Sequence, residues 1–353
     1  MNLTVSRNLL SETANERNPF LKKYFCELAA TATAADGGWS IRLFRPDDAD
    51  FYIDPDLGQG LQWWSSNFGK TEIAEIPLAL HRAKGWQLSL NDSWTLYSWS
   101  KWLQDSVKAI ETPECITVLH LDDHDDLMTP RILIDNSTGF RDLITGAAIN
   151  LRQPKTVASA VTSGAIGIGS FMAPFLNRLP NVHVRHLCST EYTTERKGPH
   201  AVSPVQVQDE LLAPDSMRPG LRLQKLAEAA DVAETPEAHP YLVTDDLVAW
   251  LKELPSGPVL VHVDMDYFNN RFNGDSDWVD EGPKYDPPLQ QVLARIDGVF
   301  QSLENAGVAE RVEDFAVALS PGFFPADLWE PSIGRIGAHV NRLLAKGKWT
   351  SRE

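Results

Sequence analysis

The segment VLVHVDMD, residues 259–266, contains the clearest strand pattern of the chain and ends in two carboxylates. A short continuous apolar run of this kind is typical of a strand buried on both faces of a parallel sheet. A second run, CITVLHL at 115–121, is followed in the same way by the acidic segment DDHDD at 122–126. We therefore expect two buried strands whose carboxyl ends both carry acidic side chains.

Strand-like and helical segments alternate along the rest of the chain. Apolar residues recur at helical spacing in the segments 93–110, 163–177, 246–254, 288–307 and 326–345. Further short apolar runs occupy 181–187 and 315–320. This alternation predicts an α/β fold, a three-layer α/β/α arrangement with a mainly parallel central sheet. Ligands bind at the carboxyl ends of the strands in such sheets, which is where both acidic segments fall.

Two regions do not follow the alternation. Residues 1–90 place aromatic side chains between turn-rich runs, and we interpret them as an irregular N-terminal segment packed on the core, with one helix near 19–33. Residues 91–353 then form the main domain. Within it, residues 198–240 are rich in Pro, Asp and Glu and are interpreted as an irregular insertion or lid. The glycine-rich run at 164–169 lacks a phosphate-loop lysine and predicts a tight strand-to-helix turn.

The composition restricts the class of partner. The 353 residues include 32 Lys and Arg against 48 Asp and Glu, a formal net charge of -16. A nucleic-acid-binding protein needs a basic face, so we expect no nucleic-acid partner. Cys26, Cys115 and Cys188 form no CxxC pair, which indicates a reducing, cytoplasmic location. The apolar stretches predict neither a signal peptide nor a membrane-spanning helix.

The two acidic segments together predict a metal site. Alternate side chains of an extended segment share a face, which groups His120, Asp122, His124 and Asp126, and likewise His262, Asp264 and Asp266. Carboxylate and imidazole ligands suit Mn, Zn or Fe ions. Packed carboxylates repel one another unless cations lie between them. The first segment alone is equally compatible with a solvated loop, but a second Asp-x-Asp on a separate strand favours two divalent ions.

These motifs resemble those of a known family. The Asp122-x-His124-x-Asp126 and Asp264-x-Asp266 patterns are similar to the two metal-binding motifs of arginases and related ureohydrolases. The segments HLDDHDDL, HVDMDYFNNRF and ALSPGFFP resemble more closely a domain family that includes the peptide arginases, which convert arginine side chains to ornithine in ribosomally made precursor peptides. The resemblance covers roughly residues 90–330 and is strong only in these three segments.

The resemblance implies an arginase-like fold for the main domain, which would be catalytic, with two Mn²⁺ ions and an arginine-containing precursor peptide as partner. Asp122 and Asp264 would bridge the two ions, Asp126 would complete one, and His124 with Asp266 the other. Arginases tend to form oligomers, so a homo-oligomer is compatible with the resemblance, although the sequence contains no interface signature.

The remaining metal ligand is open at this stage. Arginases have a histidine where this chain has Asp92, and a helix cap or Asx-turn explains Asp92 equally well. His120 and His262 are rival ligands, and they are also the candidate catalytic residues that protonate the leaving amine. Each could instead orient a metal-binding carboxylate by a hydrogen bond.

Two departures from the arginase pattern concern the substrate. Met128 stands where arginases have an asparagine that binds the free amino acid, and a later Gly-Asn-His-Gly pattern is missing. This favours a peptide substrate. The guanidine-binding glutamate of the family also has no match after the strand at 315–320, which leaves Glu191 as a weak candidate.

Three functions follow from these motifs. The first is a binuclear hydrolase of C–N bonds that cleaves the guanidine of arginine side chains to ornithine and urea. The second is a metal-dependent, deacetylase-like amidohydrolase. The third is a non-catalytic metal-binding partner in peptide modification. His183 and His186 fit none of these sites by pattern and are interpreted as ordinary core or surface histidines.

Overall fold

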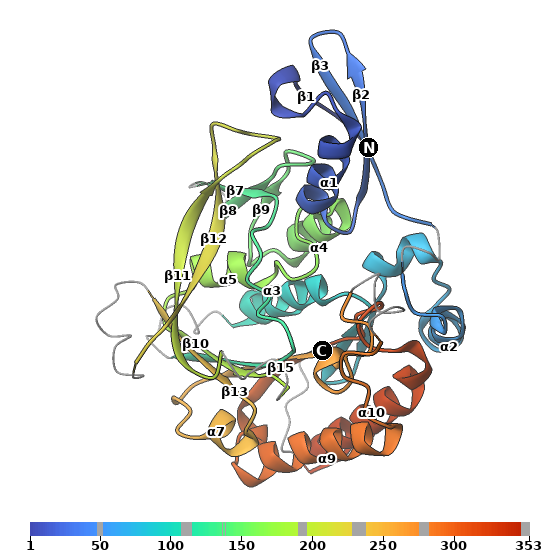
Figure 1. Cartoon of the computed structure of the whole chain (residues 1–353). Helices are drawn as coiled ribbons and strands as arrows, with labels where there is room; N and C mark the ends of the chain where they lie inside the picture. The colour runs from blue at the N-terminus through green and yellow to red at the C-terminus, as the bar shows by residue number, and fades with distance from the viewer. Residues whose placement is uncertain are drawn as a thin grey trace.

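The computed structural model describes residues 1–47, 52–106, 115–135, 137, 139–189, 196–227, 238–274 and 282–346 (Figure 1). Its centre is a nine-stranded sheet in the order β12-β11-β13-β10-β6-β14-β15-β5-β4. The strands are β4 (Leu80–Ala83), β5 (Trp86–Ser89), β6 (Ile116–Leu121), β10 (Val182–Leu187), β11 (Gly198–Gln208), β12 (Met217–Lys225), β13 (His239–Thr244), β14 (Val259–Asp264) and β15 (Val312–Ala318).

The strands from β13 to β5 in this order run parallel to one another, and β4, β11 and β12 are antiparallel to their neighbours. The predicted α/β class with a mainly parallel central sheet is therefore confirmed. The apolar runs form central strands because each is buried along its whole length, as for β6 and β14.

Helices cover both faces of the central sheet (Figure 1). One layer contains α3 (Thr95–Asp105), α4 (Pro154–Ser163) and α5 (Met172–Arg178). The other contains α7 (Leu247–Leu251), α9 (Leu289–Asn305) and α10 (Trp329–Ala345), beside α2 (Leu57–Phe68). No helix of the described residues is long and apolar enough to cross a membrane. Two smaller sheets contain β1 (Asn2–Ser6), β2 (Ala29–Ala35) and β3 (Gly38–Phe44), and β7 (Ile132–Asp135), β8 (Gly139–Asp142) and β9 (Ala148–Ile149).

Each face of the sheet contributes to a separate hydrophobic core. Val118 of β6 and Leu260 of β14 pack in the core that contains α3, α4 and α5. Leu119 and Val261, the next residues along, pack in the core that contains α9 and α10. The alternation of side chains along a strand therefore fixes which face every residue of β6 and β14 occupies.

The chain order of the strands creates a switch point between β6 and β14. From β6 the chain continues to β10 and β13 on one side, whereas β14 leads to β15 on the other side. Crevices form at the carboxyl ends of the two strands that flank such a point, because their connections leave in opposite directions. The topology thus places a site at the carboxyl ends of β6 and β14.

The prediction of an irregular segment at 1–90 was wrong in two ways. β4 and β5 belong to the central sheet, so a boundary at residue 90 cuts through it. The helix expected near 19–33 is α1 (Ala14–Phe25), and the alanine-rich residues that follow form β2. Pairing with β3 overrides the helical preference of those alanines.

The prediction of an irregular insertion at 198–240 was also wrong. β11 and β12 form a long antiparallel hairpin that extends the sheet beyond β13. Proline-rich composition concealed it, and the prolines are tolerated because β12 is an edge strand and Pro204 lies beyond the part of β11 that pairs with β13. Residues 164–169 connect α4 to α5, so they form a helix-to-helix loop rather than a strand-to-helix turn.

The helices predicted over 288–307 and 326–345 are confirmed as α9 and α10, and the one predicted over 246–254 is present as the shorter α7. The helix predicted over 163–177 was wrong for residues 164–171, which connect α4 to α5. The helix predicted over 93–110 is present as α3, and residues 107–110 lie outside the described residues.

Candidate metal centre

The six predicted metal ligands all lie at the carboxyl edge of the parallel strands. They are Asp92 after β5, Asp122, His124 and Asp126 after β6, and Asp264 and Asp266 at the end of β14. The sequence alternation holds only up to the strand ends. Beyond β6 the chain leaves the strand, with Asp126 at a φ of 52°, and beyond β14 it enters the 3-10 helix η6 (Met265–Tyr267). Turns, not a continued strand, therefore gather these side chains.

Two groups of side chains at this edge are compact enough to hold a cation, and neither group includes the predicted ligands Asp92 and Asp264. Ligand atoms of His120, Asp122, Asp126 and His262 lie within 4.8 Å of one another, and so do those of Asp122, His124 and Asp266. Asp122 belongs to both groups. The protein therefore contains a buried histidine and aspartate cluster that can hold a metal ion, and the shared carboxylate is a suitable bridge between two.

His124 lies between two carboxylates at the more open side of the cluster. Its Nδ1 is 2.8 Å from Oδ2 of Asp266 and 3.4 Å from Oδ1 of Asp122. Burial acts to lower the pKa of His124, but Asp266 and then Asp126 raise it to about 10. The metal-free imidazole is therefore protonated at neutral pH, and a cation must displace that proton before His124 can bind it.

Several carboxylate oxygens of the centre lack hydrogen-bond donors among the described residues. Oδ1 of Asp92, Oδ2 of Asp122 and Oδ2 of Asp126 are buried and accept no hydrogen bond from the described residues. Burial, and then repulsion between neighbouring aspartates, raises the pKa of all three carboxyls well above its usual value. Burying carboxylate oxygens without a partner is costly, and a divalent cation removes that cost. The donor set therefore fits a hard cation.

Specific hydrogen bonds hold Asp264 and Asp92, and one of those to Asp264 comes from the backbone amide of Asp266 at 3.2 Å. Ser320, in the segment after β15, donates its hydroxyl to Oδ2 of Asp264 at 2.5 Å. The backbone amide of Gly169 donates to Oδ2 of Asp92 at 2.6 Å. The residue at the cap of the short helix η4 (Asp92–Trp94) is Asn91, so the predicted capping role of Asp92 is not seen. Asp92 instead points towards the centre, where Asp126 raises its pKa further after burial.

The two candidate catalytic histidines form a buried pair. β6 and β14 place His120 opposite His262, and their Nδ1 atoms are 2.9 Å apart. Nε2 of His120 lies 3.0 Å from the carbonyl oxygen of His124, which can only accept, so this nitrogen carries a proton.

Burial lowers the pKa of both histidines, that of His262 to about 3, so both rings are neutral. Nδ1 of His120 is then an acceptor, and Nδ1–H of His262 donates to it. Nε2 of His262 is left with a lone pair, buried and without a partner among the described residues. His262, not His120, has the nitrogen available for a cation or a proton.

Several residues that support the centre were not predicted. Asn273 lies 3.2 Å from Nε2 of His124 through its Oδ1. His186 of β10 lies beside His120, and its Nε2 is 2.8 Å from the carbonyl oxygen of Asp122. The sequence showed His186 but not the strand register that places it there.

The neighbouring acids of the first motif support the loop rather than the cation. Asp123 is buried, and its Oδ1 accepts a hydrogen bond from the backbone amide of Ser189 at 2.8 Å. Burial and then Asp266 raise its pKa to about 7. Asp125 forms a 2.6 Å ion pair with Arg196. Neither Asp123 nor Asp125 belongs to the two compact ligand groups.

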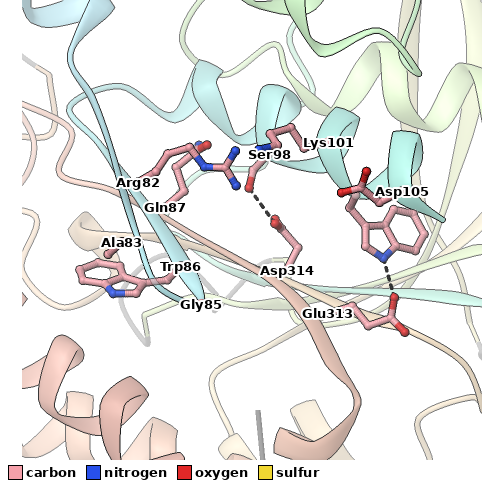
Figure 2. Close-up of a pocket in the computed structure, with 11 residues that line it drawn as sticks. Arg82, Ala83, Gly85, Trp86, Gln87, Ser98, Lys101, Asp105, Glu313 and Asp314 are labelled. Atoms are coloured by element: carbon pink, nitrogen blue, oxygen red, sulfur yellow. Dashed lines mark hydrogen bonds between the residues drawn. The ribbon is translucent and has the colours of Figure 1, made fainter. Parts of the chain in front are cut away.

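A cavity of about 730 Å³ opens on the same edge of the sheet. Its lining includes Asp245, which follows β13, Tyr267 of η6 and Arg295 of α9. None of the candidate metal ligands lines this cavity, and Tyr267, the residue after Asp266, is its nearest point to them in the sequence. A second, much smaller hollow of about 30 Å³ lies at the amino ends of β5 and β15, where Ser98 hydrogen-bonds Asp314 (Figure 2). It holds about one water molecule and is remote from the strand ends that carry the ligands.

Met128 and Glu191 were the two residues on which the expected substrate depended. Met128 is 49% exposed and lies beside Gly169, so it borders the centre without offering a hydrogen bond. Glu191 lies outside the described residues.

Comparison with known proteins adds no assignment. No protein-family model matches the chain, and a search of curated proteins finds no significant match. The chemistry of the site therefore rests on the residues themselves.

Proposed function

We propose that this protein is a binuclear metal-dependent hydrolase that cleaves the guanidine of arginine side chains in a peptide, leaving ornithine and releasing urea. The observation that carries the proposal is the pair of compact ligand groups that share Asp122. The buried, unpartnered carboxylate oxygens support it, because they need cations to balance them.

The ligand set favours manganese over zinc. Asp122 and Asp264 would hold both ions, with Asp92 and Asp126 on one and His124 and Asp266 on the other. Carboxylates outnumber imidazoles in this set, and oxygen-rich sites suit Mn²⁺. When bound, such ions would lower the pKa of a water in the site and so make hydroxide available at neutral pH.

The protein's own groups would then handle the proton and the substrate. Water adds to the guanidinium carbon, the bond to the side-chain nitrogen breaks, and that nitrogen leaves as an amine that takes up a proton. His262 has a free Nε2 in the cluster and can accept and return that proton. The net reaction consumes one water and yields one urea for each ornithine.

Charge and space support a guanidinium on a peptide. The net charge of -16 and the carboxylates at the sheet edge attract a cation. The cavity of about 730 Å³ at the same edge of the sheet could accept residues that flank the arginine. Met128 offers no hydrogen bond to a free amino acid, which also favours a peptide.

A specific observation favours a second candidate. Asp122, His124 and Asp266 form a complete three-ligand group by themselves, and the His120–His262 pair adjoins it. One ion in that group, with the histidines as acid and base, would suit a deacetylase-like amidohydrolase. A protein that binds the cation without turnover would use the same residues.

Urea release separates these functions. Mn²⁺-loaded protein is incubated with free arginine, with arginine-containing peptides and with acetyl-lysine peptides, and urea and product masses are measured. We expect urea from the peptides and a product lighter by one CN₂H₂ unit per arginine. Asp264→Ala should abolish both signals, whereas Asp297→Ala, at the exposed ion pair with Arg335, should not.

Each other outcome assigns a different function. Urea from free arginine alone would replace the peptide substrate by the amino acid. Loss of acetyl groups without urea would establish the amidohydrolase. No product from any substrate, with metal bound, would leave the non-catalytic role.

A further inference from the structure

Three histidines form a row beneath the metal centre. His186 of β10, His120 of β6 and His262 of β14 occupy the same register on adjacent parallel strands. Their ring centroids are separated by 4.6 Å and 5.1 Å, and all three side chains are fully buried. A continuous row of polar rings in an apolar core is costly unless each ring is hydrogen-bonded.

The hydrogen bonds of the row lead to the metal-binding loop. Nε2 of His186 lies 2.8 Å from the carbonyl oxygen of Asp122, and Nε2 of His120 lies 3.0 Å from that of His124. A carbonyl only accepts, so both nitrogens carry protons and donate. Two buried histidines thus bind the backbone of Asp122 and His124, two of the three candidate ligands that follow β6.

The far side of each ring fixes its tautomer. With its proton on Nε2, the neutral ring of His186 presents Nδ1 as an acceptor. The hydroxyl of Tyr241, on β13, donates to that nitrogen at 2.9 Å. His262 does the same for His120 through its Nδ1–H. The Tyr241 hydroxyl and His262 Nδ1–H therefore keep the protons of His186 and His120 on Nε2, where they face the loop.

The loop needs these donors because the strand has ended. The amide of Asp122 makes the last sheet-type bond, to the carbonyl of Leu187. Beyond it the chain turns, and the carbonyls of residues 122 and 124 are held by the histidines. Without these donors the buried carbonyls would lack hydrogen bonds, and the backbone would rearrange to find others. That rearrangement would move the carboxylate of Asp122 and the imidazole of His124.

We propose that His186 and His120, oriented by Tyr241 and His262, are positioning residues that hold the backbone of residues 122–124 so that Asp122 and His124 are set for the cation before it binds. The proposal rests on the metal centre and not on the guanidine reaction. Hydrogen-bonding partners of metal ligands are worth about 10- to 100-fold in metal affinity.

A matched histidine distinguishes this role from ordinary core packing. His239, at the start of β13, is also buried, and its Nε2 lies 2.9 Å from a backbone carbonyl, that of Leu176. It is not part of the row. Replacing His186 or His239 by leucine therefore removes the same kind of bond, but only His186 leads to the metal centre.

The test measures Mn²⁺ affinity by calorimetry, together with the visible spectrum of the Co²⁺-loaded protein, which reports coordination geometry. His186→Leu should weaken Mn²⁺ binding about 10- to 100-fold and change the Co²⁺ spectrum. His186→Gln, whose amide nitrogen replaces Nε2–H, should recover most of the affinity. His239→Leu should lower thermal stability but leave both readouts unchanged.

Equal affinities in His186→Leu and His239→Leu would overturn the proposal and make the row ordinary core. If His186→Leu does not fold, Tyr241→Phe decides, because it removes only a hydroxyl. We expect it to weaken Mn²⁺ binding about fivefold, the effect of one hydrogen bond. Unchanged affinity there would equally overturn the proposal. Weakened binding without any urea activity in the wild type would refute the proposed reaction and leave the positioning role standing.

Discussion

Protons and cations should compete for the metal centre, and this competition predicts how thermal stability depends on pH and Mn²⁺. In the metal-free protein, burial and then neighbouring aspartates raise the pKa of Asp122 and Asp126 well above the ordinary value near 3.9. The folded state therefore keeps protons that the unfolded state has already lost. For these groups the free energy of unfolding is highest below the unfolded pKa and falls as pH rises towards the folded pKa.

The dependence of stability on pH reverses when a cation is present. Mn²⁺ replaces the protons on Asp122 and Asp126, and it also displaces the proton of His124, whose metal-free pKa is about 10. Apparent affinity for Mn²⁺ should therefore rise between pH 6 and pH 8. The metal-free protein should lose stability from these carboxyls as pH rises above their ordinary pKa near 3.9, while the loaded protein keeps it.

The size of the effect follows from linkage. Mn²⁺ at a free concentration of 100 times its dissociation constant adds about 2.7 kcal/mol to the free energy of unfolding. An unfolding entropy of about 2.1 cal/mol/K per residue over 353 residues gives about 0.7 kcal/mol/K. The midpoint temperature should then rise by about 4 °C at pH 8, and by less at pH 6 for the same total Mn²⁺.

Differential scanning calorimetry at both pH values, with and without Mn²⁺, measures this. Asp122→Asn provides the control, because it keeps the shape of the shared ligand but removes its charge. A shift that is equal at both pH values, or that persists in Asp122→Asn, would refute the competition between protons and cations at this centre.

Three further substitutions test individual contacts. Ser320→Ala leaves Oδ2 of Asp264 without its 2.5 Å hydrogen bond. It should lower the free energy of unfolding of the metal-free protein by about 1–3 kcal/mol, measured by urea denaturation. An unchanged midpoint would contradict the contact. Gly169→Ala should weaken Mn²⁺ binding in calorimetry, because residue 169 has a φ of 68° and a methyl group there would lie 3.0 Å from Sδ of Met128. An affinity equal to that of the wild type would show that the loop accommodates the methyl group without moving Asp92. His262→Leu removes the buried Nε2 lone pair, so Mn²⁺ affinity or turnover should fall about tenfold or more, and unaltered values for both would remove His262 from the site.

The central strands and most candidate ligands were predictable because their signals are local. The apolar runs before Asp122 and Asp264 identify buried parallel strands, and parallel strands bring their carboxyl ends to one edge. The residues after each strand could therefore be grouped without knowing the register. The expected continuation of the strand through His124 was wrong, and turns bring the same side chains together.

The missed residues depend on information that is not local. His186 reaches Asp122 only because β10 pairs with β6 in one register, and a shift of one residue would turn its ring to the other face. Ser320 and Gly169 support the ligands from loops distant in sequence. The hairpin of β11 and β12 was hidden by its prolines, which an edge strand tolerates.

The most direct test of the binuclear centre is crystallography of the Mn²⁺-loaded protein with anomalous diffraction at the manganese edge. The account predicts two anomalous peaks about 3.5–4 Å apart, with the carboxylate of Asp122 in contact with both. A single peak bound by Asp122, His124 and Asp266 would contradict the two-ion mechanism and favour the amidohydrolase, and no peak at the carboxyl ends of β6 and β14 would contradict the metal centre itself.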